Sequence, residues 1–449
     1  MTERHDGGPG VSRGRPGALL AAIIAVILTM SAGIYFGVSR TENRAGSGAS
    51  DQLPRDNSAA PASAGRWVAS WATAPAGGEP GTETNGFAQQ SVRNVVHTSV
   101  GGTGGRVTFS NLYGQQPLRI THASIAVADA PNDPGARRGT LRRLSFGGNA
   151  GVLIRPGEQV MSDAVGLPVP AGADMLITTY TPLPSGPVTY HPHARQISYV
   201  AQGDRTLDPS GEPFSQQSPY WRYVTALDVL TTEAQGTVAV IGDSLTDGST
   251  STMGANHRWP DVLAGRLRDE DGAPHYGVVN LGISGNRVLS DGTGRPPANP
   301  SGLNRFRRDV LDRTGVKVVV VALGINDILR TPHQTDADTI TEGLRELTRQ
   351  AHARGLKVVG ATLMPFGRFR GDKPELEAAR QRVNAQIRSG HVFDEIVDFD
   401  KALQDPYAPS RLRGIYDSGD HLHPSDLGYR RMAEALDLDH LKGRAPATL

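Results

Sequence analysis

The order of apolar and polar residues differs on the two sides of residue 236. Residues 66–236 contain short apolar stretches separated by turns rich in Gly and Pro, and residues 106–110 alternate as a half-buried strand does. No stretch of ten or more residues in this range has a helical period. We therefore predict a β-sandwich for residues 66–236, with strands that include residues 106–110, 118–120, 125–127 and 176–180.

After residue 236 the apolar residues form continuous runs, the first of which is residues 237–241. Amphipathic stretches lie between these runs, and in residues 339–354 one helical face carries Ile340, Leu344, Leu347 and Ala351. Strands buried on both faces that alternate with helices predict an α/β fold with a doubly wound parallel sheet for residues 237–449. Ligands of such sheets bind beyond the carboxyl ends of the strands. Further strands are expected at residues 278–279, 316–323, 356–363 and 396–397.

The N-terminus has a third pattern, because residues 18–38 form an uncharged and largely apolar run. About 20 such residues suffice to cross a bilayer as a helix. Arg residues in the leader, residues 1–17, favour a cytoplasmic N-terminus. The best signal-peptidase site, residues 31–33, lies inside the run, so an uncleaved transmembrane signal anchor is favoured over a cleaved signal peptide. The anchor would leave the rest of the chain outside the cell membrane, and cleavage would release it as a secreted protein.

A linker is expected between this segment and the folded part of the chain. Residues 39–65 are rich in Ser, Ala, Gly and Pro and have no apolar period, which predicts disorder. The chain is thus divided into the leader, the membrane segment, the linker, a β-rich accessory domain (66–236) and an α/β domain (237–449).

Composition excludes several classes of function. The chain has no Cys, which excludes disulfides, thiolate zinc sites and a cysteine nucleophile. Its 46 Lys and Arg residues nearly balance 45 Asp and Glu residues, so a net charge of +1 provides no field to hold a nucleic acid. His191 and His193 could supply two metal ligands, but no further ligand lies at a recognisable spacing. We expect loop structure there and no metal site.

Two other features of the β-rich half have structural interpretations. The glycine-rich segment 101–105 lacks the strand-to-helix setting of a phosphate-binding loop, so it predicts a hairpin turn. Trp67 and Trp71 are expected in the core.

A candidate nucleophile follows the first parallel strand directly, in Gly242-Asp243-Ser244. A hydroxyl placed there, between small and turn-forming residues, lies at the mouth of the sheet and near a helix N-terminus. Position 246 is Thr, so the segment is not the G-x-S-x-G elbow of the α/β-hydrolases. Taken alone, the same three residues would favour an N-cap serine in an ordinary turn.

Three other segments support a catalytic site. The second strand ends near Gly282, whose amide can be exposed, and the third is followed by Asn326, whose side-chain amide can enter the same crevice. With the Ser244 amide these would be three donors for an oxyanion. Asp420 and His423 are three residues apart, so a local turn lets the carboxylate hold one imidazole nitrogen while the other faces the serine. Asp243 and Asp327 are expected to fix loop geometry, and His421 is expected at the rim.

These four segments, in this order, resemble the SGNH (GDSL-type) hydrolase family over residues 237–449. The resemblance implies a flavodoxin-like fold in which Ser244 is the nucleophile, His423 the general base and Asp420 the residue that orients His423. It also implies an oxyanion hole formed by the backbone of Ser244 with Gly282 and Asn326. The segments 258–261 and 282–287 look closest to a xylan-esterase-like subgroup, whose members often carry a β-rich N-terminal region opening with Trp-x-x-x-Trp, as residues 67–71 do.

The function implied is that of an extracytoplasmic serine esterase that needs neither metal nor other cofactor. Its substrate would be an acylated small molecule or polysaccharide, with short acyl groups such as acetyl on carbohydrate. Two alternatives stay open: a surface carbohydrate-binding protein with a vestigial site, and an acyltransferase or lipase on the same fold.

Overall fold

The computed structural model describes residues 65–292 and 299–443. The predicted leader, the apolar segment 18–38 and the linker up to residue 64 lie outside these residues. Within the described ranges, no helix has the length and apolar character needed to cross a membrane. The described residues all belong to one compact unit, and the β-rich and α/β regions are both parts of it.

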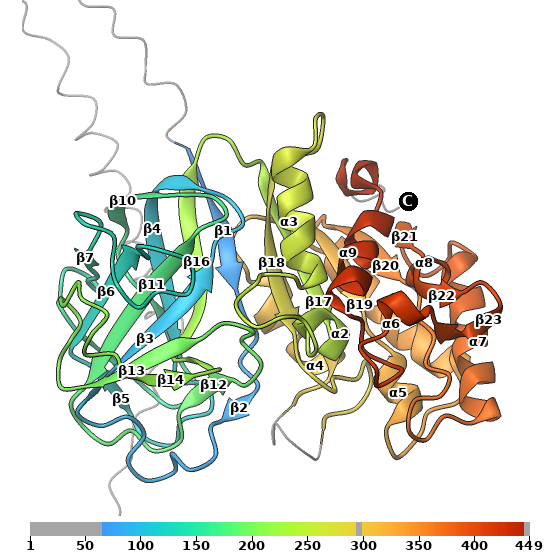
Figure 1. The fold of residues 1–449 in the computed structure, drawn as a ribbon, viewed down its shortest axis with the longest axis horizontal. Helices are drawn as coiled ribbons and strands as arrows, with labels where there is room; N and C mark the ends of the chain where they lie inside the picture. The colour runs from blue at the N-terminus through green and yellow to red at the C-terminus, as the bar shows by residue number, and fades with distance from the viewer. Residues whose placement is uncertain (1–64, 293–298, 444–449) are drawn as a thin grey trace, which may run out of the picture. The chain divides into compact units, whose positions relative to one another are not determined.

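Two antiparallel sheets form the body of the β-rich region (Figure 1). The first has the order β1 (Arg66–Ala72), β16 (Val224–Thr231), β4 (Gly102–Ser110) and β10 (Val165–Val169), with β9 (Gln159–Met161) also paired to β4. The second has the order β14 (Gln216–Ser218), β13 (Ser198–Gln202), β3 (Gln90–His97), β11 (Asp174–Thr181), β6 (His122–Val127) and β7 (Arg142–Arg143). Alternate side chains of both sheets, such as Val107 and Ile177, share one buried core. This is the arrangement expected of a β-sandwich.

Smaller strands close the ends of this region. β15 (Trp221–Arg222), β12 (Thr189–His191) and β2 (Gly77–Gly78) form one small sheet, and β5 (Leu118–Ile120) pairs with β8 (Val152–Ile154). Residues 66–236, all of which are described, contain no helix. Trp71 is buried, as predicted, whereas Trp67 is only partly covered and lies against the Arg106 guanidinium.

Two local predictions for this region were wrong. Gly102–Gly105 belongs to strand β4, and the chain turns just before it, at residues 98–101. A Cβ at Gly102 would overlap the carbonyl oxygen of Leu230 on the paired strand β16, so glycine is needed there for strand packing rather than for a turn. His191 was expected in a loop, but it is the last residue of β12.

The α/β region contains one parallel sheet with the order β18 (Tyr276–Gly282), β17 (Gly236–Gly242), β19 (Val316–Ala322), β20 (Lys357–Ala361) and β21 (Glu395–Val397). This is the doubly wound sheet that the continuous apolar runs predict. In the register of the central strands, Gly242 lies beside Gly282 and Ala322. The segments that follow these three strands therefore leave the sheet side by side, and all three carry predicted site residues.

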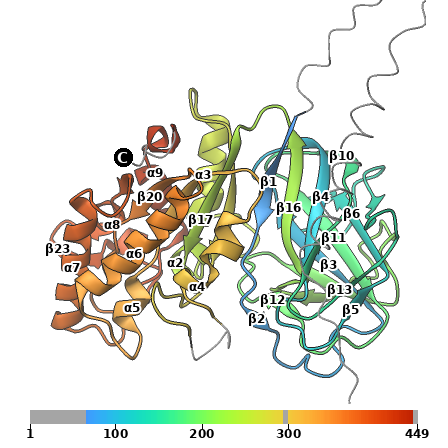
Figure 2. The same ribbon diagram turned by 180° about the vertical axis from the view of Figure 1, so that it is seen from behind.

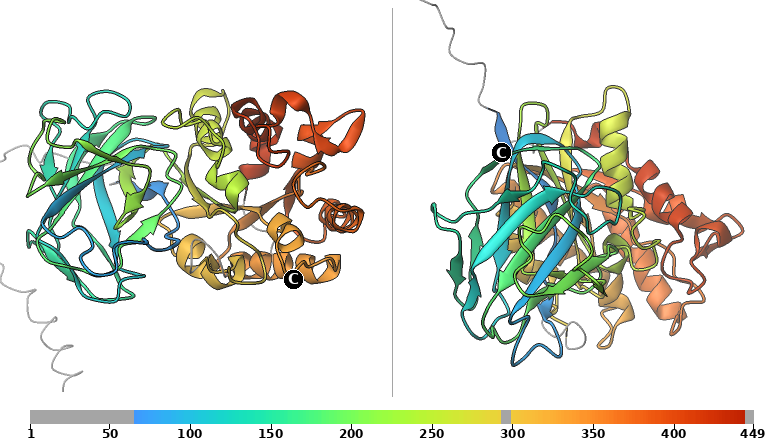
Figure 3. Two further views of the ribbon diagram at one scale, coloured as in Figure 1. Left: turned by 60° about the horizontal axis from the view of Figure 1, so that its bottom comes forward. Right: turned by 60° about the vertical axis from the view of Figure 1, so that its left-hand side comes forward.

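Helices cover both faces of this sheet. Figure 1 shows α3 (Trp259–Asp269) and α9 (Asp426–Ala435) in front of it, and Figure 2, from behind, shows α4 (Gly302–Phe306) and α6 (Ala337–His352) on the other face. The left-hand view of Figure 3 shows the same layers of helices on the two faces of the sheet. Ile340, Leu344, Leu347 and Ala351 are buried along α6, as predicted. The remaining elements are α2 (Ser244–Asp247), α5 (Ile325–Leu329), α7 (Pro374–Arg388), α8 (Phe399–Leu403), the pair β22 (Gln404–Asp405) and β23 (Ala408–Leu412), and short turns of other helix types at Arg307–Leu311, Gly414–Tyr416 and Leu438–Leu441.

Hydrogen bonds from backbone amides to side-chain hydroxyls join the two regions along strands β1 and β18. The Ala69 amide of β1 donates to the Thr237 hydroxyl of β17 at 3.0 Å, and the Val278 amide of β18 donates to the Ser99 hydroxyl at 2.9 Å. A Cβ at Gly277 would overlap the Ala69 carbonyl oxygen. The β-rich region is therefore packed backbone to backbone against the edge of the parallel sheet.

Candidate active site

Ser244 is the first residue of the short helix α2, immediately after strand β17. The preceding carboxylate, Asp243, accepts a hydrogen bond from the Leu245 amide at 3.0 Å and so caps the helix. Gly248 ends the helix in a left-handed conformation with φ of 88°. The Ser244 side chain is thereby fixed at the carboxyl end of the sheet, where its residue is 8% exposed.

The structure brings His423 and Asp420 to this serine. His423 Nε2 lies 2.9 Å from Ser244 Oγ, and His423 Nδ1 lies 2.6 Å from Asp420 Oδ2. Asp420 also accepts hydrogen bonds from the backbone amides of Leu422 and His423 at 2.9 and 2.7 Å. Burial alone would raise the pKa of the Asp420 carboxyl, but its bonds to His423 and these amides hold that pKa below the ordinary value. An ionised Asp420 keeps the proton on Nδ1 and leaves Nε2 free to accept the serine proton.

Two of the three predicted oxyanion donors, the Ser244 amide and the Asn326 side chain, have a hydrogen available for a ligand. Within the described residues, the Ser244 amide has no hydrogen-bond acceptor, as is usual for the first residue of a helix. Asn326, in α5, donates from Nδ2 to Asp243 Oδ2 at 3.1 Å and accepts from Arg330 Nε at 3.1 Å. An amide nitrogen carries two hydrogens, so the oriented Asn326 side chain retains one for a ligand.

The Gly282 amide was predicted to be an oxyanion donor, but it already has a hydrogen-bond acceptor. It donates to the Asn280 side-chain oxygen at 3.0 Å, and Asn280 in turn donates to the Thr246 carbonyl of α2 at 2.7 Å. A Cβ at Gly282 would overlap the Asp247 amide nitrogen. Gly282 therefore allows β18 to approach α2, and its amide is already paired.

Gly285, three residues later, is a better candidate that the sequence interpretation missed. Among residues 65–292 and 299–443, none accepts a hydrogen bond from its amide. Its φ is 75°, and a Cβ there would overlap the guanidinium of Arg330, the same side chain that orients Asn326. The second glycine of the segment Gly282-Ile283-Ser284-Gly285 was the available signal.

Asp243 and Asp327 fix the loops, as predicted. Asp327 accepts hydrogen bonds from the Val288 and Leu289 amides at 2.8 and 3.1 Å. Burial raises the pKa of Asp243 to about 7 and that of Asp327 to about 6. His421 pairs with Asp417 at 2.6 Å, and its side chain is 41% exposed, which agrees with a rim position.

Asp247 and His191 are further residues at this site that sequence reasoning did not find. Asp247, the last residue of α2, is buried, and its Oδ1 lies 2.9 Å from Nε2 of His191 in the β-rich region. Burial alone would raise the pKa of Asp247, but the charge and hydrogen bond of His191 hold it below its ordinary value. The two residues are 56 positions apart, and no local pattern in the sequence links them.

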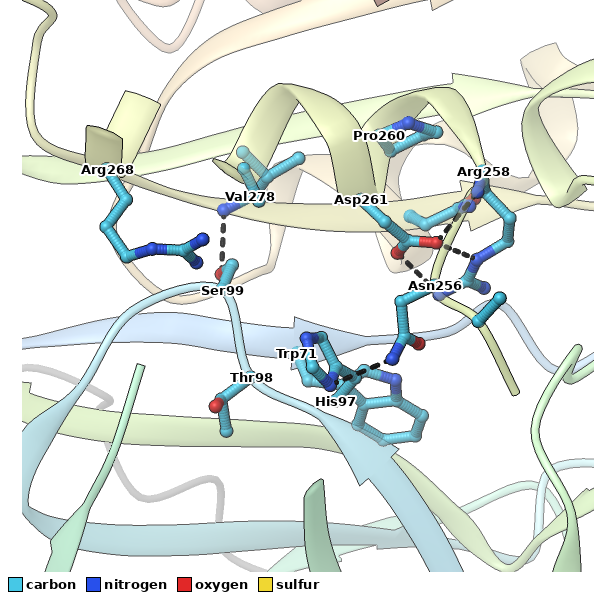
Figure 4. A pocket seen from close by; sticks show the side chains of 13 residues that line it. Trp71, His97, Thr98, Ser99, Asn256, Arg258, Pro260, Asp261, Arg268 and Val278 are labelled. Carbon is cyan, nitrogen blue, oxygen red and sulfur yellow. Dashed lines mark hydrogen bonds and ion pairs between the residues drawn. The ribbon is translucent and has the colours of Figure 1, made fainter. Parts of the chain in front are cut away.

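A separate polar cavity lies between the two regions (Figure 4). Its volume is about 260 Å³, and its lining includes Trp71, His97, Asn256, Asp261, Arg268 and Asn280. Neither Ser244 nor His423 lines this cavity, so it is distinct from the candidate active site. Over the part of the chain that the structure describes, no group of three or more His, Asp or Glu residues could hold a metal ion.

Comparison with known proteins identifies the α/β region. Residues 240–431 match the family model described as GDSL-like lipase/acylhydrolase. No curated protein matches the chain. Similar solved structures include a putative lipolytic protein of the G-D-S-L family from Desulfitobacterium hafniense DCB-2, with 20% identity, covering 44% of this chain and 97% of that chain at a TM-score of 0.34. Another is a catalytic mutant of an acetylxylan esterase from Geobacillus stearothermophilus, with 21% identity, covering 46% and 94% of the two chains at a TM-score of 0.34. The chain thus contains a domain of the GDSL-like lipase/acylhydrolase family, and it is a carboxylic ester hydrolase.

Proposed function

We propose that this hydrolase cleaves esters through an acyl-enzyme on Ser244. The observation that carries the proposal is the hydrogen-bonded series from Ser244 Oγ to His423 Nε2 and from His423 Nδ1 to Asp420. A serine hydroxyl is a weak nucleophile, and a base in contact with it removes its proton as the new bond forms.

Each step of this reaction has a residue to perform it. Ser244 Oγ attacks the ester carbonyl while His423 Nε2 takes the hydroxyl proton. The negative charge on the carbonyl oxygen is held by the Ser244 amide, the free Asn326 hydrogen and the Gly285 amide. His423 then gives its proton to the departing alcohol, leaving an acyl-Ser244 ester. Water, deprotonated by His423, attacks this ester and releases the carboxylic acid together with free Ser244.

We propose that the acyl group is short, such as acetyl, and that it is carried on carbohydrate. Segments 258–261 and 282–287 support this through their resemblance to xylan esterases.

A chain-length series tests both parts of the proposal. The purified protein should hydrolyse 4-nitrophenyl acetate with a higher kcat/KM than the octanoate and dodecanoate, and it should release acetate from acetylated xylan. Ser244→Ala should abolish both reactions, and full activity in this variant would refute the acyl-enzyme. Binding of the glycan without release of acetate would identify a carbohydrate-binding protein instead.

We also propose that residues 18–38 anchor the protein in the cell membrane, with the hydrolase outside. The uncharged run and the Arg residues before it support this orientation. Protease added to intact cells should remove the hydrolase from the membrane fraction. Full-length protein in the soluble cell fraction, protected from that protease, would refute the anchor.

A further inference from the structure

The segment His191-Pro192-His193 has a place at the active site, although it lies in the β-rich region. His191 ends strand β12, where it pairs with Trp221 of β15, and it is 2% exposed. Its ring lies 5.6 Å from the Trp221 ring at an angle of 33°. The imidazole is therefore held in one orientation by a strand and by an aromatic neighbour.

Both nitrogens of this ring face oxygen acceptors. Nδ1 lies 2.8 Å from the carbonyl oxygen of Ala74, and Nε2 lies 2.9 Å from Oδ1 of Asp247. A carbonyl oxygen can only accept, and so can an ionised carboxylate. The ring is therefore held between the Ala74 carbonyl and the buried Asp247 carboxylate, with one nitrogen bonded to each.

Asp247 connects this ring to both sides of the catalytic site. Its Oδ2 accepts hydrogen bonds from the amide and the hydroxyl of Ser284 at 3.0 and 2.7 Å, and Ser284 directly precedes Gly285. Its own amide donates to the Asp243 carbonyl at 2.8 Å, across the helix that begins with Ser244. One carboxylate thus fixes the end of the nucleophile helix and the loop that presents the candidate oxyanion amide.

We propose that His191 is a positioning residue of the hydrolase, supplied by the β-rich region, which holds Asp247 and through it the Ser244 helix and the Ser284-Gly285 loop. The inference rests on the proposed function of Ser244. The β-rich region would then take a direct part in turnover, because the alignment of the nucleophile and the oxyanion donor depends on the side chain of His191.

A matched pair of substitutions tests this role. An Asn side chain can place its NH₂ group near the former Nδ1 and keep the bond to Ala74, whereas a Gln side chain reaches the position of Nε2 and keeps the bond to Asp247. Both variants lose the imidazole ring. We expect His191→Asn to lower kcat by about 100-fold with little change in KM, since small misplacements of reacting groups cost about that much. The kcat of His191→Gln should be at least about tenfold higher than that of His191→Asn.

The control is a second His–Asp pair, partly buried and far along the chain. His352 Nε2 lies 2.9 Å from Asp394 Oδ1, between α6 and the segment before β21. His352→Gln should lower the melting temperature and leave kcat unchanged. Equal losses of kcat in His191→Asn and His191→Gln, or wild-type kcat in a folded His191→Asn, would overturn the inference.

Ser284→Ala provides the test if neither His191 variant folds. It removes the hydroxyl bonds to Asp247 and Ser249 and keeps the backbone bond to Asp247. We expect about a tenfold loss of kcat; an unchanged kcat would overturn the inference. Ser244→Ala separates the two proposals. If it is inactive while His191→Asn has wild-type kcat, only the role of His191 fails, whereas an active Ser244→Ala refutes the proposed function itself.

Discussion

A buried carboxylate of the β-rich region, Glu79, and two at the strand ends of the α/β region, Asp243 and Asp327, are held in different ways. In the β-rich region, Arg222 donates from Nε and Nη2 to the two carboxylate oxygens of Glu79, each at 2.6 Å. At the strand ends of the α/β region, Asp243 and Asp327 are held by amide groups, and burial raises their pKa to about 7 and about 6. A buried carboxylate with a bidentate arginine remains charged, whereas one held only by amides is costly to ionise. Carboxylates whose pKa is raised in this way are common at functional sites. Here Asp243 directly precedes Ser244, and Asp327 directly follows Asn326.

The largest effect is expected from Ser244→Ala. Without the hydroxyl no acyl-enzyme forms, so kcat should fall by at least about 10,000-fold while the fold is retained. Hydrolysis of 4-nitrophenyl acetate at saturating substrate measures this, with circular dichroism to verify folding. Residual activity within tenfold of wild type would show that the reaction does not take place at the strand ends of the α/β region.

Ser244→Ala should lower kcat and keep the fold, whereas Arg222→Met should strongly lower the free energy of unfolding. Glu79 would be left as an unpaired buried carboxylate, which costs about 3–5 kcal/mol in the free energy of unfolding. Urea denaturation measures the change. The control is Arg349→Met, which breaks an exposed pairing with Glu342 and Glu346 and should cost at most about 1 kcal/mol. Equal losses in the two variants would contradict the comparison.

Asn326→Ala should lower kcat by roughly 100- to 1,000-fold, because it removes one oxyanion donor. KM should change little, since the charge that Asn326 stabilises develops only in the transition state. Steady-state kinetics with the acetate ester measure both constants. A rise in KM at constant kcat would show that Asn326 binds substrate and has no special role in the transition state.

A further effect concerns pH and Asp243. Its folded pKa of about 7 lies above its ordinary value of 3.8, so its contribution to stability is fully present below about pH 4 and is lost as the pH rises through 7. Asn cannot titrate. The unfolding free energy of wild type relative to Asp243→Asn should therefore decrease between pH 4 and 7, as urea denaturation would show. Parallel stability curves would mean that Asp243 is ionised across this range.

The sequence predicted the parts of the structure that depend on local pattern. The run 237–241 marked strand β17, observed at residues 236–242, because a strand buried on both faces has contiguous apolar residues. Asp420 and His423 are also local, since three residues separate them, and the structure brings them together with Ser244. The predictions for Gly102–Gly105 and His191 were wrong, because strand β16 and Asp247, both distant in sequence, determine their surroundings.

The junction between the two regions restricts how a substrate can reach the serine. Only residues 232–235 separate the end of β16 from the start of β17, and hydrogen bonds from Ala69 to Thr237 and from Val278 to Ser99 cross the same junction. Enzymes that close around a substrate need a hinge that absorbs large changes in backbone angles. Four linking residues, with hydrogen bonds between the regions beside them, leave little backbone for such a hinge. The β-rich and α/β regions should therefore keep one relative arrangement with and without a bound ester, and the ester must reach the serine over a surface that does not open.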